Sequence, residues 1–421
     1  MTYIEKIIKL EMLKYFSVIA LLFMGLSCQN KPTTYNKTSK TDSLTNKFQA
    51  IYDKGNFHGF DVSIVDNNQV FYQKAFGYAD VESKKKYTLS TKHSTGSVSK
   101  TLIGISLLKA QELGKLKLDD PINKYLSFSV KNPYFPTTDI TIRHLANHTS
   151  TIADTDFYDE NSYSFRNNKH LNSKVPIKIE SYFNPVQKSI SLSEFMKKVI
   201  YTEEDTCCRE TFIEAEPGSN FLYSNGGATL AAVVLERATG MSFIDFTKRY
   251  ILEPLEMNAS SWDENQTEAT LYLNKDTVYA EYRNLDYPAG ALVTNTTDLS
   301  KYLQELIKGY NGNSSLLSKN SYATLFNTPF IKEIAKQDFG DMNPFMNIKY
   351  DEGVFMGVAP KNFVGHTGSD PGIVTFLFFN SKTNCGFTFR TNRSIGAVYE
   401  ETLNDLWSIL KVLEEEVSEQ E

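Results

Sequence analysis

Segments typical of β-strands lie near both ends of this chain, and segments typical of helices fill the middle. Residues 60–65 and 70–77 are short apolar runs joined by a polar turn, which predicts a hairpin. The runs 372–380 and 386–391 predict a second hairpin, followed by an amphipathic helix over 398–415. This order predicts an α+β fold: one antiparallel sheet flanked by N- and C-terminal helices, with an inserted, mostly helical lobe.

The chain has 421 residues, of which 41% are hydrophobic, so it has ample apolar surface for a large core. We expect one folded domain over residues 48–421, with a sheet lobe at about 48–117 and 285–415 and a helical lobe at about 118–284. A cleft between two such lobes is a usual place for a site. Residues 154–190 are polar and aromatic with little periodicity, which predicts a long surface loop or lid.

The first 27 residues are typical of an export signal. Lys6, Lys9 and Lys14 precede the apolar run 16–24, which suits a signal peptide better than a membrane span. Gly25-Leu26-Ser27-Cys28 resembles a bacterial lipobox, in which the cysteine is lipidated; an ordinary secretory peptide with an incidental cysteine is the alternative.

We therefore expect Cys28 to carry a lipid and residues 28–47 to form a flexible polar tether. The protein would then be a lipoprotein of the cell envelope, anchored to a membrane and facing the periplasm or the cell surface. The sequence does not indicate which membrane, nor the oligomeric state.

The remaining composition argues against several classes of ligand. The formal net charge is −6 and basic residues are scattered, so nothing indicates a nucleic-acid partner. Cys207 and Cys208 are either a strained vicinal disulfide or two thiols, and Cys385 is left over. His144 and His148 are spaced i, i+4 without a third ligand, which favours structural histidines over zinc. We expect no metal and no organic cofactor.

The stretch Ser97-Val98-Ser99-Lys100 places a hydroxyl and an amine three positions apart at the start of an apolar helical run. Such positions are neighbours on one helix face. A lysine whose pKa is lowered by burial can take the proton of the serine and make it a nucleophile. The same spacing begins at Ser83 and Ser408, but there a lysine-rich loop and a polar helix face predict solvent exposure.

Two further stretches extend this pattern. Residues 216–227 contain Tyr223-Ser224-Asn225 before a strong apolar helix, and residues 363–372 contain His366-Thr367-Gly368. With Ser97 and Lys100, they resemble the signature elements of the serine β-lactamase and penicillin-binding protein superfamily. The Tyr-x-Asn form resembles the class C β-lactamase branch, which includes D-alanyl-D-alanine carboxypeptidases, D-aminopeptidases and esterases. The resemblance runs from about residue 50 to about 412 in the order of the family.

The resemblance implies a role for each matching residue. Ser97 would be the acylated nucleophile, Lys100 the base, and Tyr223 a partner in the proton shuttle. Asn225 would hydrogen-bond Lys100 and the substrate amide. The backbone N–H groups of Ser97 and Ser369 would form the oxyanion hole. The substrate-binding residues would be Asn225, His366, Thr367, Gly368 and Ser369.

The sequence departs from the family pattern at three places. His366 stands where class C enzymes have lysine, which predicts weaker preference for carboxylate-bearing β-lactams and better activity at acidic pH. Thr151 stands where the family has glycine, which we expect to alter that turn. The separation between Ser97 and Tyr223 is long for the family, and the excess falls in residues 154–215.

The resemblance thus implies a serine hydrolase that acts on an ester or amide through an acyl-Ser97 intermediate. A D-alanyl-D-alanine carboxypeptidase or D-aminopeptidase acting on cell-wall peptides is the first alternative. A β-lactamase and a non-catalytic binding protein with the same fold are the others. The substrate would be a small molecule or a peptide.

Overall fold

The computed structural model describes residues 37–169, 175–187, 190–201, 210–337, 339–340, 342–395 and 400–419. The predicted signal peptide, Cys28, Cys207 and Cys208 lie outside the described residues. Cys385 is a buried free thiol. Among the helices that the structure describes, none has the length and apolar character needed to cross a membrane.

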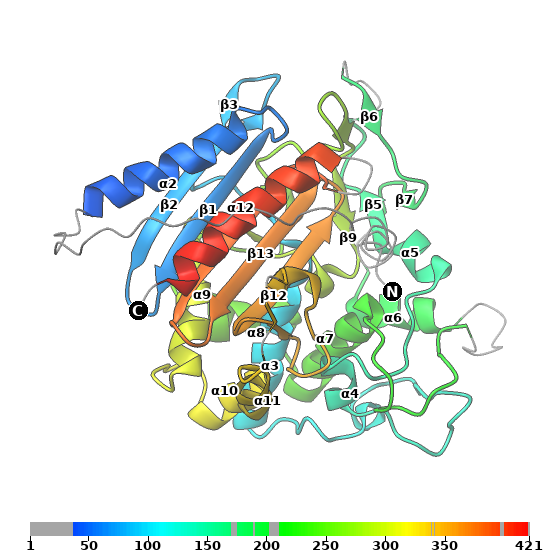
Figure 1. Ribbon diagram of the computed structural model, residues 1–421. Coiled ribbons are helices and arrows are strands. Elements are labelled where there is room, and N and C mark those ends of the chain that lie inside the picture. Colours follow the sequence, from blue (N-terminus) through cyan, green and yellow to red (C-terminus); the bar gives the residue numbers. More distant parts are fainter. Residues whose placement is uncertain are drawn as a thin grey trace.

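The main sheet has seven antiparallel strands (Figure 1). In spatial order they are β11 (Gly357–Ala359), β12 (Phe363–Asp370), β13 (Ile373–Asn380), β14 (Cys385–Thr391), β1 (Gly59–Asp66), β2 (Val70–Asp80) and β3 (Lys85–Lys86). Both predicted hairpins are confirmed, with Phe60 opposite Phe76 in the first and Phe378 opposite Phe387 in the second. Strand β14 also pairs with β1, so segments from the two ends of the chain lie side by side.

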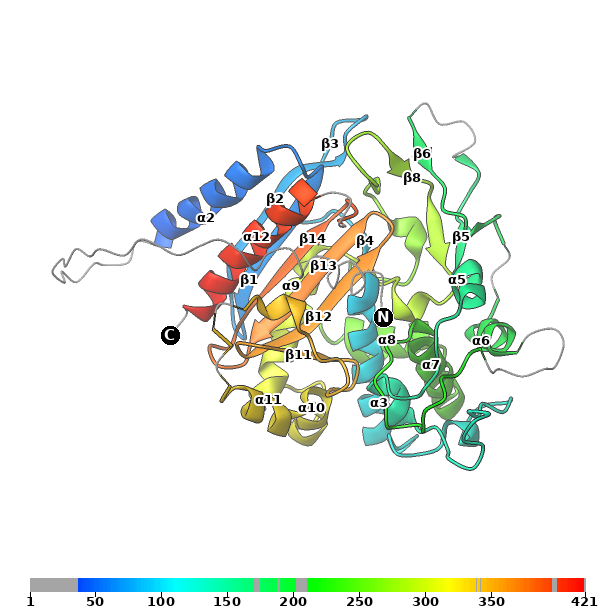
Figure 2. The same cartoon turned by 45° about the vertical axis from the view of Figure 1, so that its right-hand side comes forward.

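Helices cover both faces of this sheet (Figures 1 and 2). Helices α2 (Lys37–Tyr52) and α12 (Glu400–Ser418) lie on one face, and α9 (Thr296–Tyr310) packs against β1 and β14 on the other. Strand β13 shows the alternation expected of a strand between two layers: Phe376 and Phe378 join the core under α2 and α12, whereas Leu377 and Phe379 join the core on the side of α9. The predicted α+β fold class is confirmed.

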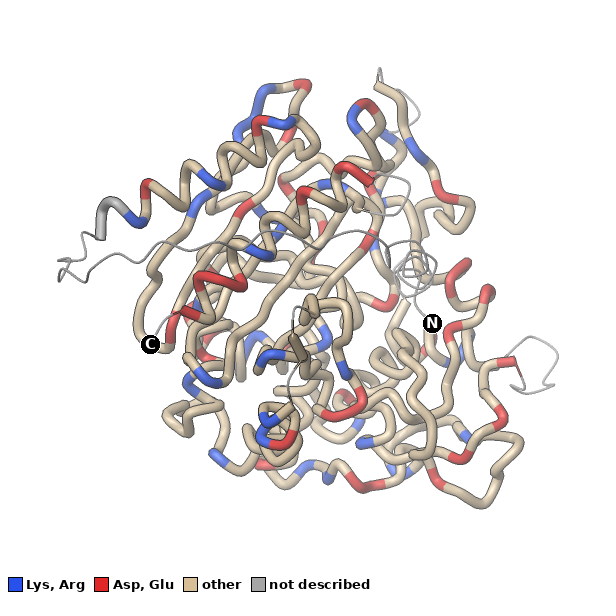
Figure 3. The backbone as a smooth tube through the Cα atoms, in the orientation of Figure 1, with Lys and Arg blue, Asp and Glu red and all other residues tan. Residues whose placement is uncertain are grey.

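Helix α2 corrects one prediction. The tether was expected to extend to residue 47, but the chain is helical from Lys37. Leu44, Phe48 and Ile51 recur at positions i, i+4 and i+7 and are buried against the sheet. Residues of both charge signs lie along α2 and α12 (Figure 3). The Lys40 Nζ of α2 forms an ion pair with Glu416 Oε2 of α12 at 2.8 Å.

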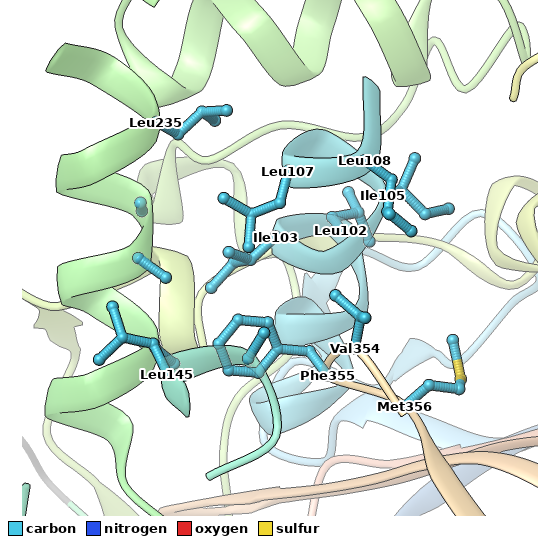
Figure 4. Packing of buried hydrophobic residues seen from close by; sticks show 14 of the residues in the cluster. Leu102, Ile103, Ile105, Leu107, Leu108, Leu145, Leu235, Val354, Phe355 and Met356 are labelled. Atoms are coloured by element: carbon cyan, nitrogen blue, oxygen red, sulfur yellow. The ribbon is translucent and has the colours of Figure 1, made fainter. Parts of the chain in front are cut away.

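The remaining helices lie mainly on the α9 side of the sheet. They are α3 (Lys100–Glu112), α4 (Ile142–Ala146), α5 (Asp156–Ser162), α6 (Leu192–Ile200), α7 (Asn225–Thr239), α8 (Phe243–Thr247), α10 (Lys319–Phe326) and α11 (Thr328–Ile334). Helix α3 packs beside α7, and Ile103, Leu107 and Leu235 belong to one buried cluster (Figure 4). Helix α7 ends at Gly240, whose φ of +73° is the left-handed conformation typical of a helix terminus.

Short helical turns connect these elements. They are the 3₁₀ turns η1 (Gly96–Ser99), η2 (Ile122–Lys124), η5 (Glu264–Gln266), η6 (Tyr287–Ala289) and η7 (Pro344–Met346), and the π-helical turn η4 (Lys248–Leu252) after α8.

Three small sheets complete the described part of the fold. They pair β4 (His93–Ser94) with β10 (Val293–Thr294), β5 (Tyr163–Phe165) with β7 (Phe183–Asn184) and β9 (Tyr282–Asn284), and β6 (Ile177–Lys178) with β8 (Val278–Tyr279). The prediction of a loop or lid over 154–190 is therefore wrong for the residues that the structure describes there. Helix α5 and strands β5, β6 and β7 belong to this segment, and β5 is hydrogen-bonded to β9, more than 100 residues later in the chain.

Candidate active site

Ser97 lies in the turn η1, directly before α3, and Lys100 is the first residue of α3. The Lys100 Nζ donates a hydrogen bond to Ser97 Oγ at 3.0 Å and another to the carbonyl oxygen of Ala289 at 2.6 Å. The expected juxtaposition of hydroxyl and amine is therefore present. Ser99 fixes the turn from behind, because its Oγ accepts a hydrogen bond from the backbone N–H of Leu292 at 3.0 Å.

Strand β12 passes unusually close to η1. A Cβ atom on Gly368 would lie 2.0 Å from the Thr95 carbonyl oxygen and 3.1 Å from the Ser97 nitrogen. A Cβ on Gly96, whose φ is +55°, would lie 2.7 Å from the Ser369 nitrogen. A side chain at either position would force the backbone to move. The two glycines thus allow the backbone N–H groups of Ser97 and Ser369 to come to the same edge of the site.

The Lys100 side chain is fully buried. Loss of hydration is the larger effect and lowers the pKa of the Lys100 amine to about 8, while the charges of Asp286, Asp154 and Asp370 oppose this shift and raise the pKa. A substantial fraction of the amine is therefore uncharged slightly above neutral pH, as a general base requires.

Asp154 joins the site to helix α7. Its carboxylate accepts hydrogen bonds from the Ser224 hydroxyl at 2.8 Å and from the backbone N–H groups of Asn225 and Gly226 at 2.6 and 2.9 Å. A carboxylate at a helix N-terminus is stabilised by these unpaired N–H groups. No hydrogen bond joins the described residues Asn225 and Lys100; the Lys100 amine donates to Ser97 and Ala289.

Two tyrosines from the segment expected to be a loop hold two further carboxylates. Tyr158 of α5 donates to Asp286 Oδ2 at 2.6 Å, and Tyr163 of β5 donates to Asp370 Oδ1 at 2.7 Å. Burial raises the pKa of both carboxyl groups, and that of Asp286 reaches about 7. Asn284 of β9 donates to the other oxygen of Asp370 at 3.0 Å.

An aromatic group surrounds Tyr223. Its ring is stacked on His148 with centroids 4.3 Å apart, and the Lys100 Nζ lies 5.2 Å from its centroid. His366 and Tyr350 are its other aromatic neighbours, at 6.3 and 5.6 Å. Tyr350 also contacts Thr367, with 2.8 Å between the two hydroxyl oxygens. The structure therefore brings Ser97, Lys100, Tyr223 and the stretch from His366 to Ser369 together.

Both histidines of this group are buried and uncharged. Burial, followed by the charge of Lys100, lowers the pKa of His148 well below its ordinary value. Its Nδ1 accepts a hydrogen bond from the Ser224 backbone N–H at 3.2 Å. Burial lowers the pKa of His366 to about 3. The lowered pKa argues against the charge on His366 on which a gain of activity at acidic pH would depend, and the gain itself stays a prediction.

The other departures from the family pattern are accommodated locally. Thr151 adopts a left-handed φ of +66°, a conformation that favours glycine. The Thr151 hydroxyl accepts a hydrogen bond from Asn132 at 2.9 Å, which supports this conformation. His148 lies beyond the end of α4 and not on one helix face with His144. Within the described residues, no group of three metal-binding side chains occurs.

The comparison with known families identifies the fold. Residues 44–409 match the Beta-lactamase family. The chain belongs to this family. Among curated proteins it is similar to "Protein flp" of Staphylococcus aureus (strain MRSA252), with 25% identity over 80% of this chain and 60% of the relative. It is also similar to "Penicillin-binding protein 4*" of Bacillus subtilis (strain 168), with 24% identity over 87% of this chain and 75% of the relative.

Solved structures share this fold. The octameric penicillin-binding protein homologue from Pyrococcus abyssi aligns with 90% of this chain and 79% of its own, with a TM-score of 0.63 and 21% identity. D-amino acid amidase from Ochrobactrum anthropi SV3 aligns with 88% of this chain and 99% of its own, with a TM-score of 0.60 and 18% identity. The chain spans about 60% of the length of the staphylococcal relatives.

Five residues of the site were not predicted from the sequence, namely Asp154, Tyr158, Tyr163, Asp286 and Asp370. Two of them lie next to sequence motifs that could have indicated them. Asp370 directly follows Ser369, and Asp286 lies two residues before Pro288 at the return to the sheet. The two tyrosines gave no local signal, because their partners are 128 and 207 residues away in the chain.

Proposed function

We propose that this protein is a serine hydrolase that cleaves an ester or amide through an acyl-enzyme on Ser97. The observation that carries the proposal is the 3.0 Å hydrogen bond between Lys100 Nζ and Ser97 Oγ in a site where burial lowers the pKa of the lysine. Membership of the Beta-lactamase family supports the same chemistry. Burying an amine costs free energy, and a binding protein without an activated hydroxyl would gain nothing from doing so.

In the proposed reaction, Ser97 Oγ attacks the carbonyl carbon of the substrate while its proton passes to the uncharged Lys100 amine. The Ser97 and Ser369 N–H groups donate to the oxyanion, and the bond to the leaving group breaks as Tyr223 relays a proton to it. Water then attacks the acyl carbon, releases the acid and restores the Ser97 hydroxyl. Lys100 and Tyr223 return to their starting protonation states over the cycle.

Labelling with a fluorophosphonate probe tests this proposal. We expect a single adduct in the intact mass of the protein from residue 29 onward and none in Ser97→Ala. Ser83→Ala is the matched control, since Ser83 begins another S-x-x-K stretch but is exposed on the loop beside β3. A folded wild-type protein that acquires neither this adduct nor one from a penicillin would instead indicate a binding protein.

The finer activity is a separate proposal. Hydrolysis of D-amino-acid derivatives from cell-wall peptides is supported by the fold shared with D-amino acid amidase and by the family relationship to a penicillin-binding protein. A panel of simple esters, D-amino-acid amides and β-lactams, each with wild type and Ser97→Ala, distinguishes an esterase, a D-aminopeptidase and a β-lactamase.

We also propose that the protein is exported and anchored through a lipid on Cys28, on the basis of the lipobox-like sequence. Full-length protein expressed with an alkyne fatty acid should be labelled in wild type and not in Cys28→Ser. Cys385→Ser serves as the control, because Cys385 is a buried thiol in β14. Labelling that survives in Cys28→Ser excludes this anchor.

A further inference from the structure

Three carboxyl groups lie near the Lys100 amine beside the proposed nucleophile. Lys100 is the cation whose charge acts on Asp154, Asp286 and Asp370 alike. Histidine instead of lysine at position 366 leaves this imbalance in place, because the buried His366 ring is uncharged. A buried excess of one charge sign is unfavourable unless it has a partner. Burial raises the pKa of all three carboxyl groups, so the charge of Lys100 does not fully offset the cost of ionising them there.

Two acceptor atoms, on residues that are two positions apart in the chain, lack a donor among the described residues. Asp286 Oδ1 and Asn284 Oδ1 are buried, and no donor in the described residues reaches either atom. Each residue is only 6% exposed. The opposite atom of each group is bonded, Asp286 Oδ2 to Tyr158 and Asn284 Nδ2 to Asp370, so both side chains are held in position. Buried acceptors without a donor are uncommon and destabilising, which points to a partner that arrives with the substrate.

This acidic cluster, formed by Asn284, Asp286 and Asp370, borders the reacting atoms. The Lys100 amine that contacts Ser97 Oγ also donates to Ala289, and the next residue is Gly290. A Cβ on Gly290 would lie 3.1 Å from Asn284 Nδ2 and 3.4 Å from Asp370 Oδ2. Asp370 also directly follows Ser369, whose backbone nitrogen lies close to Gly96. A substrate carbonyl at Ser97 would thus have the cluster beside it.

We propose that the acidic cluster binds an ammonium group of the substrate, so that the enzyme prefers esters or amides with a primary amine next to the scissile carbonyl over carboxylate-bearing substrates. This inference rests on the proposed hydrolase function. Charge-assisted N–H···O hydrogen bonds to Asp286 Oδ1 and Asn284 Oδ1 would satisfy both atoms. The Tyr158 and Tyr163 hydroxyls act as positioning groups, because each holds one carboxylate from the side of the inserted segment.

Aromatic residues of the protein lie beside Lys100, where the side chain of the substrate would contact them. Tyr223, Tyr350 and His148 form the aromatic group beside Lys100, and Phe221, which is 40% exposed, contacts His148 edge-on with centroids 6.2 Å apart. These rings favour an aromatic substituent. Phenylalanine amide, in both enantiomers, is therefore a suitable probe, and 3-phenylpropanamide is the isostere that lacks the amine.

Calorimetric binding of both amides to Ser97→Ala tests the inference without requiring turnover. We expect phenylalanine amide, in at least one enantiomer, to bind about tenfold more tightly than 3-phenylpropanamide. Asp286→Asn and Asp370→Asn should abolish the preference, whereas Asp139→Asn, an exposed carboxylate away from the site, should retain it. Unfolding curves of each variant confirm that it is folded, and Asn284→Ala provides a second disruption of the cluster without changing the charge.

The outcomes separate the two proposals. Equal binding of the two amides, or a preference that survives in the folded Asp286→Asn and Asp370→Asn variants, overturns the ammonium site even if Ser97 is labelled by the fluorophosphonate. A preference for the amine in a protein that is never labelled at Ser97 supports the ammonium site and removes the hydrolase function. For an active wild type, kcat/KM for phenylalanine p-nitroanilide should exceed that for the 3-phenylpropanoyl analogue by about tenfold.

Discussion

Replacing Gly368 with alanine should disturb the close approach of β12 and η1 while leaving the rest of the fold intact. The φ of Gly368 does not lie in the left-handed region, so alanine introduces no backbone strain of that kind. Its Cβ would lie 2.0 Å from the Thr95 carbonyl oxygen, whereas such contacts are essentially never shorter than 3.0 Å. The atom that it meets belongs to the backbone and cannot rotate away. The strand and the turn must therefore move apart by roughly 1 Å.

This displacement falls between the two N–H groups that the proposed oxyanion hole requires. A misplacement of about 1 Å in a catalytic arrangement typically costs on the order of 100-fold in rate. Overpacking of this kind destabilises a fold by about 1–3 kcal/mol. We therefore expect Gly368→Ala to be folded but about 100-fold slower in acylation of Ser97 by a fluorophosphonate.

The assay is the pseudo-first-order labelling rate, measured by intact mass, together with urea unfolding of the same samples. Gly240→Ala is the matched control: its Cβ would meet nothing within 4 Å, and placing alanine in the left-handed conformation costs about 1–2 kcal/mol. It should be labelled at the wild-type rate. Labelling of folded Gly368→Ala within about threefold of wild type would refute the idea that this contact sets the geometry of the site.

Three further predictions concern charged groups. Burial lowers the pKa of Lys100 to about 8. The acylation rate should therefore rise as pH increases through 8, because the amine loses its proton there, and should then level off. A rate that is flat from pH 6 to 10 contradicts a lysine base. Tyr158→Phe removes the 2.6 Å hydrogen bond that lowers the pKa of Asp286, so Asp286 becomes more protonated. Because the negative charge of Asp286 raises the pKa of Lys100, the midpoint of the pH–rate profile should then move to lower pH. An unchanged midpoint argues against this coupling. Arg390→Met leaves the fully buried Asp61 without its 2.7 Å ion-pair partner and should lower the free energy of unfolding in urea by about 3–5 kcal/mol, much of which Asp61→Asn in the same chain should restore.

Local patterns predicted the elements that carry the main motifs. The β1–β2 hairpin has apolar runs on both sides of a polar turn, and α3 and α7 have apolar spacing with glycine after the last turn. Ser97 and Lys100 were predicted to meet because their separation of three residues fixes it on any helical turn. The features predicted correctly are those whose determining residues lie within about ten positions of each other in the sequence.

The parts that were missed depend on distant partners or on a weak local pattern. Tyr158 and Tyr163 are buried because carboxylates more than 100 residues away accept their hydrogen bonds, and the surrounding polar sequence resembles a loop. The polar composition of residues 37–47 predicts a tether, whereas the apolar spacing of Leu44, Phe48 and Ile51 is the signal of helix α2. The pKa of His366 was unpredictable for another reason: it depends on burial, which the motif does not reveal.

The pairing of β1 with β14 has a consequence for how this protein is made. Asp61 and its partner Arg390 are 329 residues apart, so at about 5–20 residues per second a ribosome needs roughly 15–65 s to supply the strand that β1 awaits. During that time the first hairpin has an open edge, and open edges attract other strands. A chain truncated before β14 lacks the centre of its sheet and the Asp61 counter-ion together. Newly synthesised protein should thus depend on folding assistance until residue 391 emerges, and a nascent chain halted before that point should be cleared by proteolysis.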